Sequence, residues 1–572
     1  MPTRCIFGNA APGRSCVTWT RPARFGAPMS RTVELVLEIE AQSANEWMNE
    51  RAAHGRRGQS HAGTPSIGHE LADRLSRTRS VELLHAREPV TVRVFQIGDA
   101  ALRVLLEERS GARRLLATRA KRLVPGVRLN EAICDVALEA GTPLAFNDAL
   151  SSEVGHALGM PDALVPSSVL LMNRTVWRWQ TSVGPVVDIA LLDAYDLAAP
   201  ESAATHPRAL PRFCELHLSA TCDPGTESHK GHDEAARAAA AAARAVFAVA
   251  ERLVDILPAF PTLTDVFARA RGEAPSSEPV RAARVELFDA KTPHEALVAI
   301  GCNVARHWFG NEHGVRESST TEFVHQMRVA LRRMKTLLKT FPRWTDDTWM
   351  TRVAPGIDWL GGLLGEARDL DVFVDATLPT LAAADIDAKT WHKAHAAAEA
   401  RRLQARASVQ QALRSRRHAA LSLAWLDWLA GQHFANGPQP EADLPLTAYA
   451  AKRVRKHYQR LTAESALTAL DVAGRHRRRI EAKRLRYTLE FFEGLASPKT
   501  RREVAKQLGR LQSVLGEGSD AATALRFLEE LEVTPYQKGF ARGWCEAVNR
   551  CAAHEGERLL RELRKPKIVR DA

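Results

Sequence analysis

The stretch from Glu322 to Arg343 constrains this chain most, because it has the period of a helix with a purely cationic face. Apolar residues occupy the opposite side, and no acidic residue lies between Phe323 and Arg343. Exposed helices normally mix both signs of charge, since like charges at i,i+4 repel. The pattern indicates a helix that binds an anion. Its cationic arc holds His325, Arg328, Arg332, Lys335 and Lys339.

The same spacing occurs again 151 residues downstream, at His476, Arg479, Lys483 and Arg486. The correspondence extends beyond the charges, because Phe341 matches Phe492, Leu364–Gly365 matches Leu515–Gly516, and Asp369 matches Asp520. A repeat of this length predicts two copies of one structural unit packed together. We therefore expect the two basic helices to face a shared groove or channel. The correspondence fails at Lys339, which aligns with Glu490.

The fold class predicted is multidomain α+β. A β-rich part with helices between its strands comes first, an Ala-rich helix covers Asp233–Leu257, and residues 273–289 form a Gly/Pro/Ser-containing linker. Residues 290–568 have helical period almost throughout, starting at a capping box, Thr292-Pro-His-Glu295. The expected strands are Thr32–Glu40, Ala101–Glu107, Arg113–Lys121, Thr175–Thr181, Val186–Leu192 and Phe213–Ser219, with short helices at Ser43–Ala53 and Leu71–Leu84.

Composition narrows the class of partner. The net charge of +12 and the pI near 9.5 favour anionic partners. The eight cysteines form no C-x-x-C pair, which favours a reducing, cytoplasmic setting. No apolar run approaches the roughly 20 residues of a membrane span. Residues 1–28 contain four arginines and no acid, and indicate either a disordered arm or a segment upstream of a true start at Met29.

Four segments of the helical part resemble the CHAD family: FVHQMRVALRRMKTLLKTF, LLGEARDLDVF, GRHRRRIEAKRLRYTLEFF and LQSVLGEGSDAATAL. The resemblance covers about residues 290–568. It implies two pseudo-symmetric four-helix bundles, a basic surface or channel, and binding of inorganic polyphosphate. The phosphate-binding residues we expect are His325, Arg328, Arg332, Lys335, Lys339, Arg368, His476, Arg479, Lys483, Arg486 and Tyr487.

Two further groups have competing interpretations. Asp369 and Asp371, which flank Arg368 in the sequence EARDLD, could bind a metal ion together. The favoured interpretation is that they orient arginines through ion pairs, as Asp520 would in the second copy. A further set of basic residues either widens the path of the anion along the expected groove or forms an ordinary solvated face. These residues are Arg401, Arg402, Arg453, Arg455, Lys456 and Arg460.

Residues 29–272 resemble the CYTH, or triphosphate-tunnel, fold, an antiparallel β-barrel that closes around a triphosphate. The entry signature of that family is Glu-x-Glu-x-Lys. This chain has Thr32, Glu34 and Val36 there in the preferred register, whereas a second register places Glu38, Glu40 and Gln42 there. Both registers lack the lysine.

Later positions of that resemblance are also incomplete. Leu105 and His217 replace a basic residue and a carboxylate, and the register at Lys121 and Arg122 is open by one residue. The resemblance implies a residual triphosphate site at Arg103, Lys121 and Arg174, and metal ligands at Glu34, Asp188 and Glu215. Since a metal-dependent triphosphatase needs such groups in number, we expect a weakened or inactive domain. Ordinary polar strand positions and residual triphosphate or nucleotide binding remain alternatives.

Nucleic acid is a weaker candidate than inorganic polyphosphate, because single-strand binders interleave aromatic residues with cations and the basic stripes offer only Tyr487. We therefore expect a cytoplasmic polyphosphate-binding protein, with polyphosphate granules as a candidate location. No cofactor is needed for this binding, and Mg²⁺ or Mn²⁺ would be needed only by an active CYTH-like domain. A metal-dependent phosphohydrolase and a scaffold that targets partners to granules are the alternatives.

Overall fold

The computed structural model describes six ranges of the chain: residues 30–39, 75–95, 101–138, 166–197, 212–222 and 231–569. Positions 76, 79, 110, 183, 274–275, 288, 436–438 and 442–443 within them are not described. The expectations for residues 1–28, for a helix at Ser43–Ala53, and for Glu40 and Gln42 lie outside the described residues.

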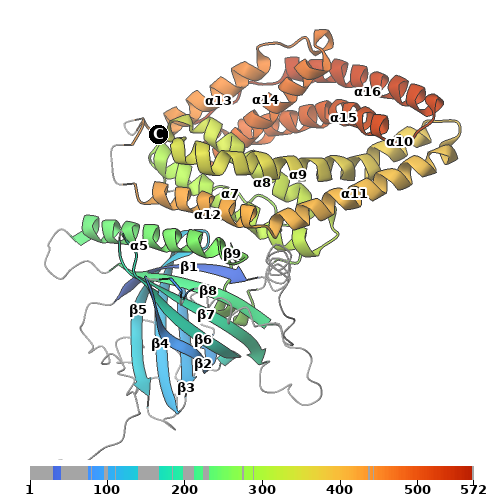
Figure 1. The fold of residues 1–572 in the computed structure, drawn as a ribbon. Coiled ribbons are helices and arrows are strands. Elements are labelled where there is room, and N and C mark those ends of the chain that lie inside the picture. Colours follow the sequence, from blue (N-terminus) through green and yellow to red (C-terminus); the bar gives the residue numbers. More distant parts are fainter. Residues whose placement is uncertain are drawn as a thin grey trace, which may run out of the picture.

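The N-terminal part is an antiparallel sheet that closes on itself (Figure 1). β1 pairs with both β8 and β5, so eight of the described strands form a ring, and β9 adds to β1. The strands are β1 Arg31–Ile39, β2 Val81–Phe95, β3 Leu102–Arg109, β4 Ala112–Val124, β5 Val127–Leu138, β6 Pro166–Trp179, β7 Val187–Leu197, β8 Arg212–Thr221 and β9 Ala259–Pro261.

Two strands depart from the sequence prediction. The helix predicted over Leu71–Leu84 is wrong from Val81 onward, where β2 begins. Register shifts between Leu83 and Glu88 break the strand alternation there, so VELL has no period of two. β5 was not predicted because its pairing with β4 skips Ile133, which also disturbs the alternation. Gly126, with φ +78°, allows the tight turn between β4 and β5.

Helix α5 (Gly231–Val254) lies between the ring and the helical domain, and the short helix α6 (Val266–Ala270) follows β9. The helical domain begins at the predicted capping box, where Thr292 and Glu295 cap each other's backbone N–H groups. None of the described helices has the length and apolar character that crossing a membrane requires. The domain consists of α7 Pro293–Glu317, α8 Thr321–Thr340, α9 Ala354–Val372, α10 Leu378–Ala383, α11 His392–Leu413, α12 Arg416–His433, α13 Leu446–Thr462, α14 Val472–Phe491, α15 Ala505–Glu530 and α16 Pro535–Glu562.

The internal repeat extends to the boundaries of secondary structure. α8 and α14 have equal length at an offset of 151 residues, and α9 and α15 begin at the same offset. The connection repeats too, with a 3-10 turn at Pro342–Trp344 and Glu493–Leu495. The equivalent rings of Phe341 and Phe492 pack 6.1 Å apart, so the two copies meet at these residues. The arrangement as two four-helix bundles stays a prediction.

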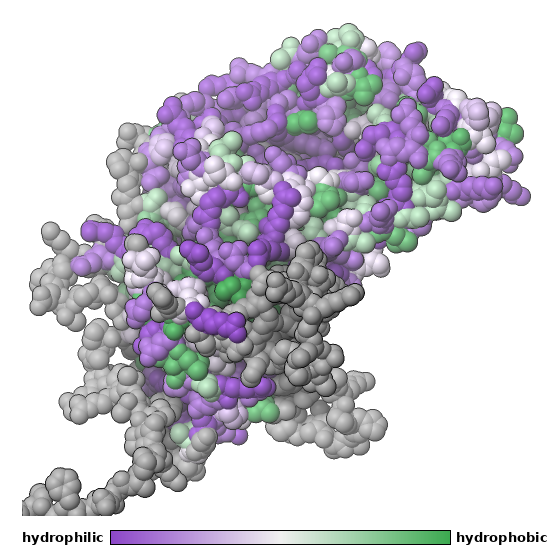
Figure 2. Space-filling model, viewed as in Figure 1, coloured by the Kyte–Doolittle hydropathy of each residue, from purple (hydrophilic) through white to green (hydrophobic). Residues whose placement is uncertain are grey.

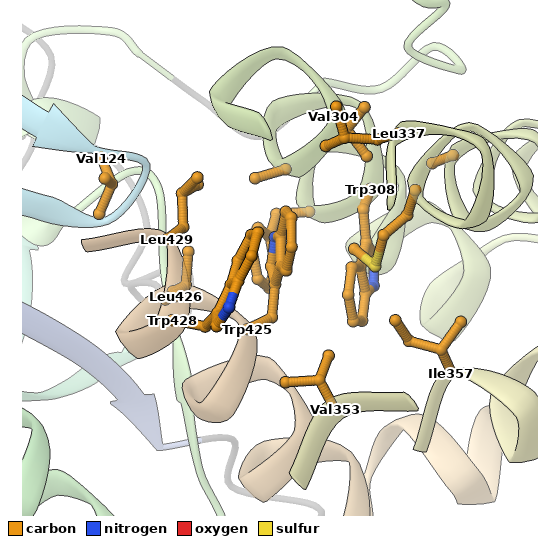
Figure 3. Close-up of a cluster of buried hydrophobic side chains, with 14 of the residues drawn as sticks. Val124, Val304, Trp308, Leu337, Val353, Ile357, Trp425, Leu426, Trp428 and Leu429 are labelled. Carbon is orange, nitrogen blue, oxygen red and sulfur yellow. The ribbon is translucent and has the colours of Figure 1, made fainter. Parts of the chain in front are cut away.

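The two parts of the chain share one hydrophobic core, shown in Figure 3. Leu426 and Leu429 of α12 lie between Val124 of β4 and the tryptophans of the helical domain. Trp425 stacks on Trp428 at 5.4 Å between ring centroids. Helix α12 therefore joins the β ring to the helical domain.

Candidate functional site

A pocket of about 360 Å³ lies between α8 and α14, the two helices that carry the cationic stripes. Figure 2 shows hydrophilic side chains around the hollow between α9 and the α14–α15 pair. Eight of the eleven residues predicted to bind phosphate line this pocket. Its lining consists of Arg328, Arg332, Lys335, Thr336, Lys339, Asp369, His476, Arg479, Ile480, Lys483, Arg484, Tyr487, Ser519, Asp520 and Thr523.

Packing of the apolar face fixes the direction of these cations. Met327, Leu331 and Met334 of α8 are buried, as the helical period predicts. The opposite face of α8 therefore has to point toward α14, α9 and α15. Of the apolar residues on α14, Leu485 and Leu489 are buried in the same core. The sequence prediction that both stripes face one groove is thus met by the geometry.

Two arginines in the pocket are held by equivalent aspartates. The guanidinium of Arg328 contacts the carboxylate of Asp369 at 2.6 Å, and that of Arg479 lies 3.7 Å from Asp520. Arg479 also donates to the Ser519 hydroxyl at 3.0 Å. These contacts agree with the favoured interpretation, in which aspartates orient arginines.

Arg332 and Lys483 are different, because neither side chain forms a salt bridge or hydrogen bond with any described residue. Burial, together with the neighbouring charge of Arg328, lowers the pKa of Arg332 to about 10. Burial and the charges of Arg332 and Arg479 lower the pKa of Lys483 to about 6. Both shifts mean that the free pocket opposes positive charge, and that an anion would relieve this opposition.

Three predicted contacts lie outside this pocket. His325 is half-buried near Arg368, and burial together with that charge lowers the pKa of His325 to about 4. Arg486 instead donates to Glu490 at 2.9 Å, one turn along α14. Glu490, where the repeat breaks, therefore neutralises the cation that has no place in the pocket.

Several other lining residues were not predicted. Ser519 and Thr523 add hydroxyl groups from α15, and Thr336 adds one from α8. A signal existed for Ser519, because it directly precedes Asp520 in the repeated segment. Asp371 does not belong to the pocket, since it is fully buried and bound to Arg406 at 2.7 Å. Likewise Arg453 is buried and pairs with Glu441, so it does not widen the anion path.

Comparison with known proteins decides the family. The family model of the CHAD domain matches residues 299–529. A solved structure described as the CHAD domain from the plant Ricinus communis is 31% identical, covering 51% of this chain and 100% of that one, with a TM-score of 0.44. The chain belongs to the CHAD domain family. The structure of PptA from Streptomyces chartreusis also matches, with 19% identity over 48% of this chain and 99% of that one, and a TM-score of 0.37. No curated protein matches the chain.

The β ring that precedes the CHAD domain contains its own anion, the carboxylate of Asp265 at the start of α6. This side chain has no exposed surface and accepts from Arg103 at 2.5 Å and from Arg128. Burial alone would raise the pKa of Asp265, but the charges of Arg103 and Arg128 lower it far below its usual range. The ring of Phe267 lies 5.0 Å from the Arg103 guanidinium. Sequence reasoning missed Asp265, because it caps a short helix that lies outside the strands on which the resemblance rests.

A second buried network joins Glu34 and Glu215 through His217. The imidazole contacts Glu34 at 2.9 Å through Nδ1 and Glu215 at 3.1 Å through Nε2. Burial alone would lower the pKa of His217, but its hydrogen bonds to Glu215 and Glu34 raise it to about 9. Burial opposes ionisation of Glu34, yet the His217 hydrogen bond and Arg103 lower the pKa of Glu34 to about 2. The imidazolium occupies the position that a cation would take between two carboxylates.

The three residues predicted to form a residual triphosphate site, Arg103, Lys121 and Arg174, do not line one cavity. Arg103 lines one cavity of about 300 Å³ with Arg122, Arg128 and Arg271, whereas Arg174 lines another. Lys121 lines neither cavity, whereas its neighbour Arg122 lines the cavity that contains Arg103.

The metal ligands expected at Glu34, Asp188 and Glu215 do not fit a divalent ion as arranged. Asp188 forms a two-pronged pair with Arg178 at 2.8 and 2.9 Å, while the two glutamates bind His217. Among the described residues there is no group of three or more His, Cys, Asp or Glu placed to hold a metal ion.

Proposed function

We propose that the chain binds inorganic polyphosphate in the pocket between α8 and α14. The observation that carries the proposal is the pair Arg332 and Lys483, two half-buried basic side chains without a partner among the described residues, which lie between two arginines anchored by aspartates. Basic groups that are partly removed from water without a counter-charge are costly, so their presence at equivalent positions of both copies points to a ligand that supplies negative charge. Phosphate oxygens accept hydrogen bonds from guanidinium and ammonium groups.

A base-free phosphate polymer suits this pocket better than nucleic acid. Tyr487 is the only aromatic residue in the pocket lining among the described residues, and it is largely buried. Stacking on successive bases would therefore contribute little to binding, whereas the basic side chains of the pocket can contribute through their charge. The membership of the chain in the CHAD family supports the same ligand, because the family resemblance implies polyphosphate.

We infer that the β ring is not a working triphosphatase. Its arginines at 103 and 128 already bind Asp265, and its glutamates bind His217. The chain would then be a binding protein, active in the cytoplasm or at polyphosphate granules without a cofactor. The alternatives differ in readout: a hydrolase releases phosphate from tripolyphosphate with Mg²⁺ or Mn²⁺, and a granule scaffold loses its protein partners when polyphosphate is removed.

Charge reversal at the anchored arginines tests the binding site. Arg328→Glu with Arg479→Glu should lower polyphosphate affinity by more than about 100-fold at moderate salt. The matched control is Arg501→Glu with Arg502→Glu, which makes the same change in net charge at exposed positions outside the pocket. Equal losses in both double variants would mean that only overall charge matters, and unchanged affinity in the first would refute the site.

A further inference from the structure

A second pocket, of about 590 Å³, opens beside the phosphate pocket between α14, α15 and α16. We call it the side pocket. The two cavities share His476, Ser519 and Thr523, so a ligand in one can continue into the other. A cavity of this size is typical of sites for organic ligands.

The residues that line the side pocket differ between the two copies of the repeat. Ser519, Ala522 and Arg526 line it, and the residues 151 positions earlier are Arg368, Asp371 and Asp375. In the first copy those two aspartates bind arginines of α11, with Asp371 on Arg406 at 2.7 Å and Asp375 on Arg402 at 2.6 Å. In the second copy a small residue replaces Asp371 and a cation replaces Asp375. The space filled by ion pairs in the first copy is therefore open in the second.

The chemistry of the side pocket differs from that of the phosphate pocket. Part of its lining is apolar, formed by Leu515, Ala522, Ala552 and Ala553, and no acidic residue is among its described lining. An apolar wall offers nothing to an inorganic phosphate chain, whereas a nucleobase can pack against it. Guanidinium groups stack on planar rings, and amide and hydroxyl groups can bond to a base or sugar. The side pocket offers both kinds of group, in Arg475, Arg477, Arg526, Asn549, Ser519 and Thr523.

We propose that the joined pockets bind a nucleoside polyphosphate, with its phosphate chain between α8 and α14 and its nucleoside in the side pocket. The proposal rests on the proposed function, because the phosphate pocket anchors the ligand. It adds a specificity that the phosphate pocket alone lacks, since the nucleoside can enter from the second copy and not from the first.

Calorimetric titration of the full chain with adenosine tetraphosphate and with inorganic tetrapolyphosphate tests it. The two ligands have equal numbers of phosphates, and the nucleotide carries less negative charge, so electrostatics alone favours the inorganic chain. We expect the nucleotide to bind about tenfold tighter. Ala522→Phe, at a half-buried position, should remove this preference and leave tetrapolyphosphate affinity unchanged.

The control is Ser513→Phe, which adds the same ring to an exposed position of α15 outside both pockets. It should retain the preference for the nucleotide. Failure of wild-type chain to bind either ligand would overturn the proposed function itself. Tight tetrapolyphosphate binding without a preference for the nucleotide, or a preference that survives Ala522→Phe, would overturn the side-pocket proposal alone.

Discussion

Arg332 and Lys483 occupy equivalent positions of the two copies, and both side chains line one pocket without a salt bridge or hydrogen bond to any described residue. A positive charge on either residue disfavours positive charge on its neighbours, because each lowers the pKa of other basic groups in the pocket. The free protein thus holds a site that is destabilising until an anion enters. A substitution that removes one of these basic groups should therefore raise the stability of the protein and lower its affinity for polyphosphate.

Removal of either unpaired cation should stabilise the free protein. Arg332→Met or Lys483→Met is expected to add about 0.5–2 kcal/mol to the free energy of unfolding of the helical domain. Urea denaturation without polyphosphate measures the change. Lys335→Met is the control, because Lys335 is exposed and contacts Asp358 at 2.6 Å, so its removal should add no stability. A loss of stability in both test variants would show that these cations have partners in the free state.

Polyphosphate binding should take up a proton at neutral pH. The pKa of Lys483 is about 6 in the free pocket, and a bound anion should return it toward its ordinary value of 10.5. Affinity is then highest below pH 6 and falls as pH rises, by up to about tenfold per unit. Titrations in buffers of different ionisation enthalpy measure the uptake. The Lys483→Arg variant keeps its positive charge at all these pH values, so it should bind polyphosphate without taking up a proton. If its affinity depended on pH as strongly as that of wild type, the proton would be taken up by another group.

The stability of the β ring should depend on pH through His217. Its pKa is raised to about 9, so its contribution is complete below its ordinary value of 6.5 and is lost as pH rises through 9. That contribution is on the order of 3 kcal/mol, from about 1.4 kcal/mol per pKa unit. Unfolding of wild type and His217→Gln at pH 6 and pH 10 measures it. The difference between the two proteins should shrink at pH 10, and an equal difference at both values would contradict the assignment.

Asp265→Asn should destabilise the β ring by roughly 3–5 kcal/mol, because Arg103 and Arg128 lose their shared counter-charge. Added tripolyphosphate should then protect the variant more than wild type if the carboxylate stands in for a phosphate. Asp188→Asn is the control, since Asp188 is 39% exposed beside Arg178 and should cost at most about 1 kcal/mol. An Asp265→Asn protein as stable as wild type would contradict the internal-anion account.

Most of the basic residues that line the pocket between α8 and α14 could be predicted from the sequence, whereas the contacts inside the β ring could not. Helical period placed Arg328, Arg332 and Lys335 on one face, and the repeat brought in Arg479 and Lys483 because duplicated units keep equivalent faces together. Arg486 pairs with its i,i+4 neighbour Glu490 and does not line the pocket. The pair is visible in the sequence, but the repeat led to the prediction that Arg486 binds phosphate.

By contrast, Asp265 reaches Arg103 and Arg128 from 162 and 137 residues away. No local pattern encodes such a contact, because it arises from where β9 and α6 place the chain after the ring has closed. For the same reason, the division of Arg103 and Arg174 between two cavities could not be read from their strands. The β2 boundary was missed for a local reason, since its register shifts remove the period of two.

The salt dependence of polyphosphate binding by wild type and by Arg332→Met with Lys483→Met tests the central claim most directly. Each cation that contacts phosphate contributes about one to the slope of log affinity against log salt. The account predicts that the double variant binds more weakly and that its slope is smaller by roughly two. An unchanged slope with unchanged affinity would show that polyphosphate does not enter the pocket between α8 and α14.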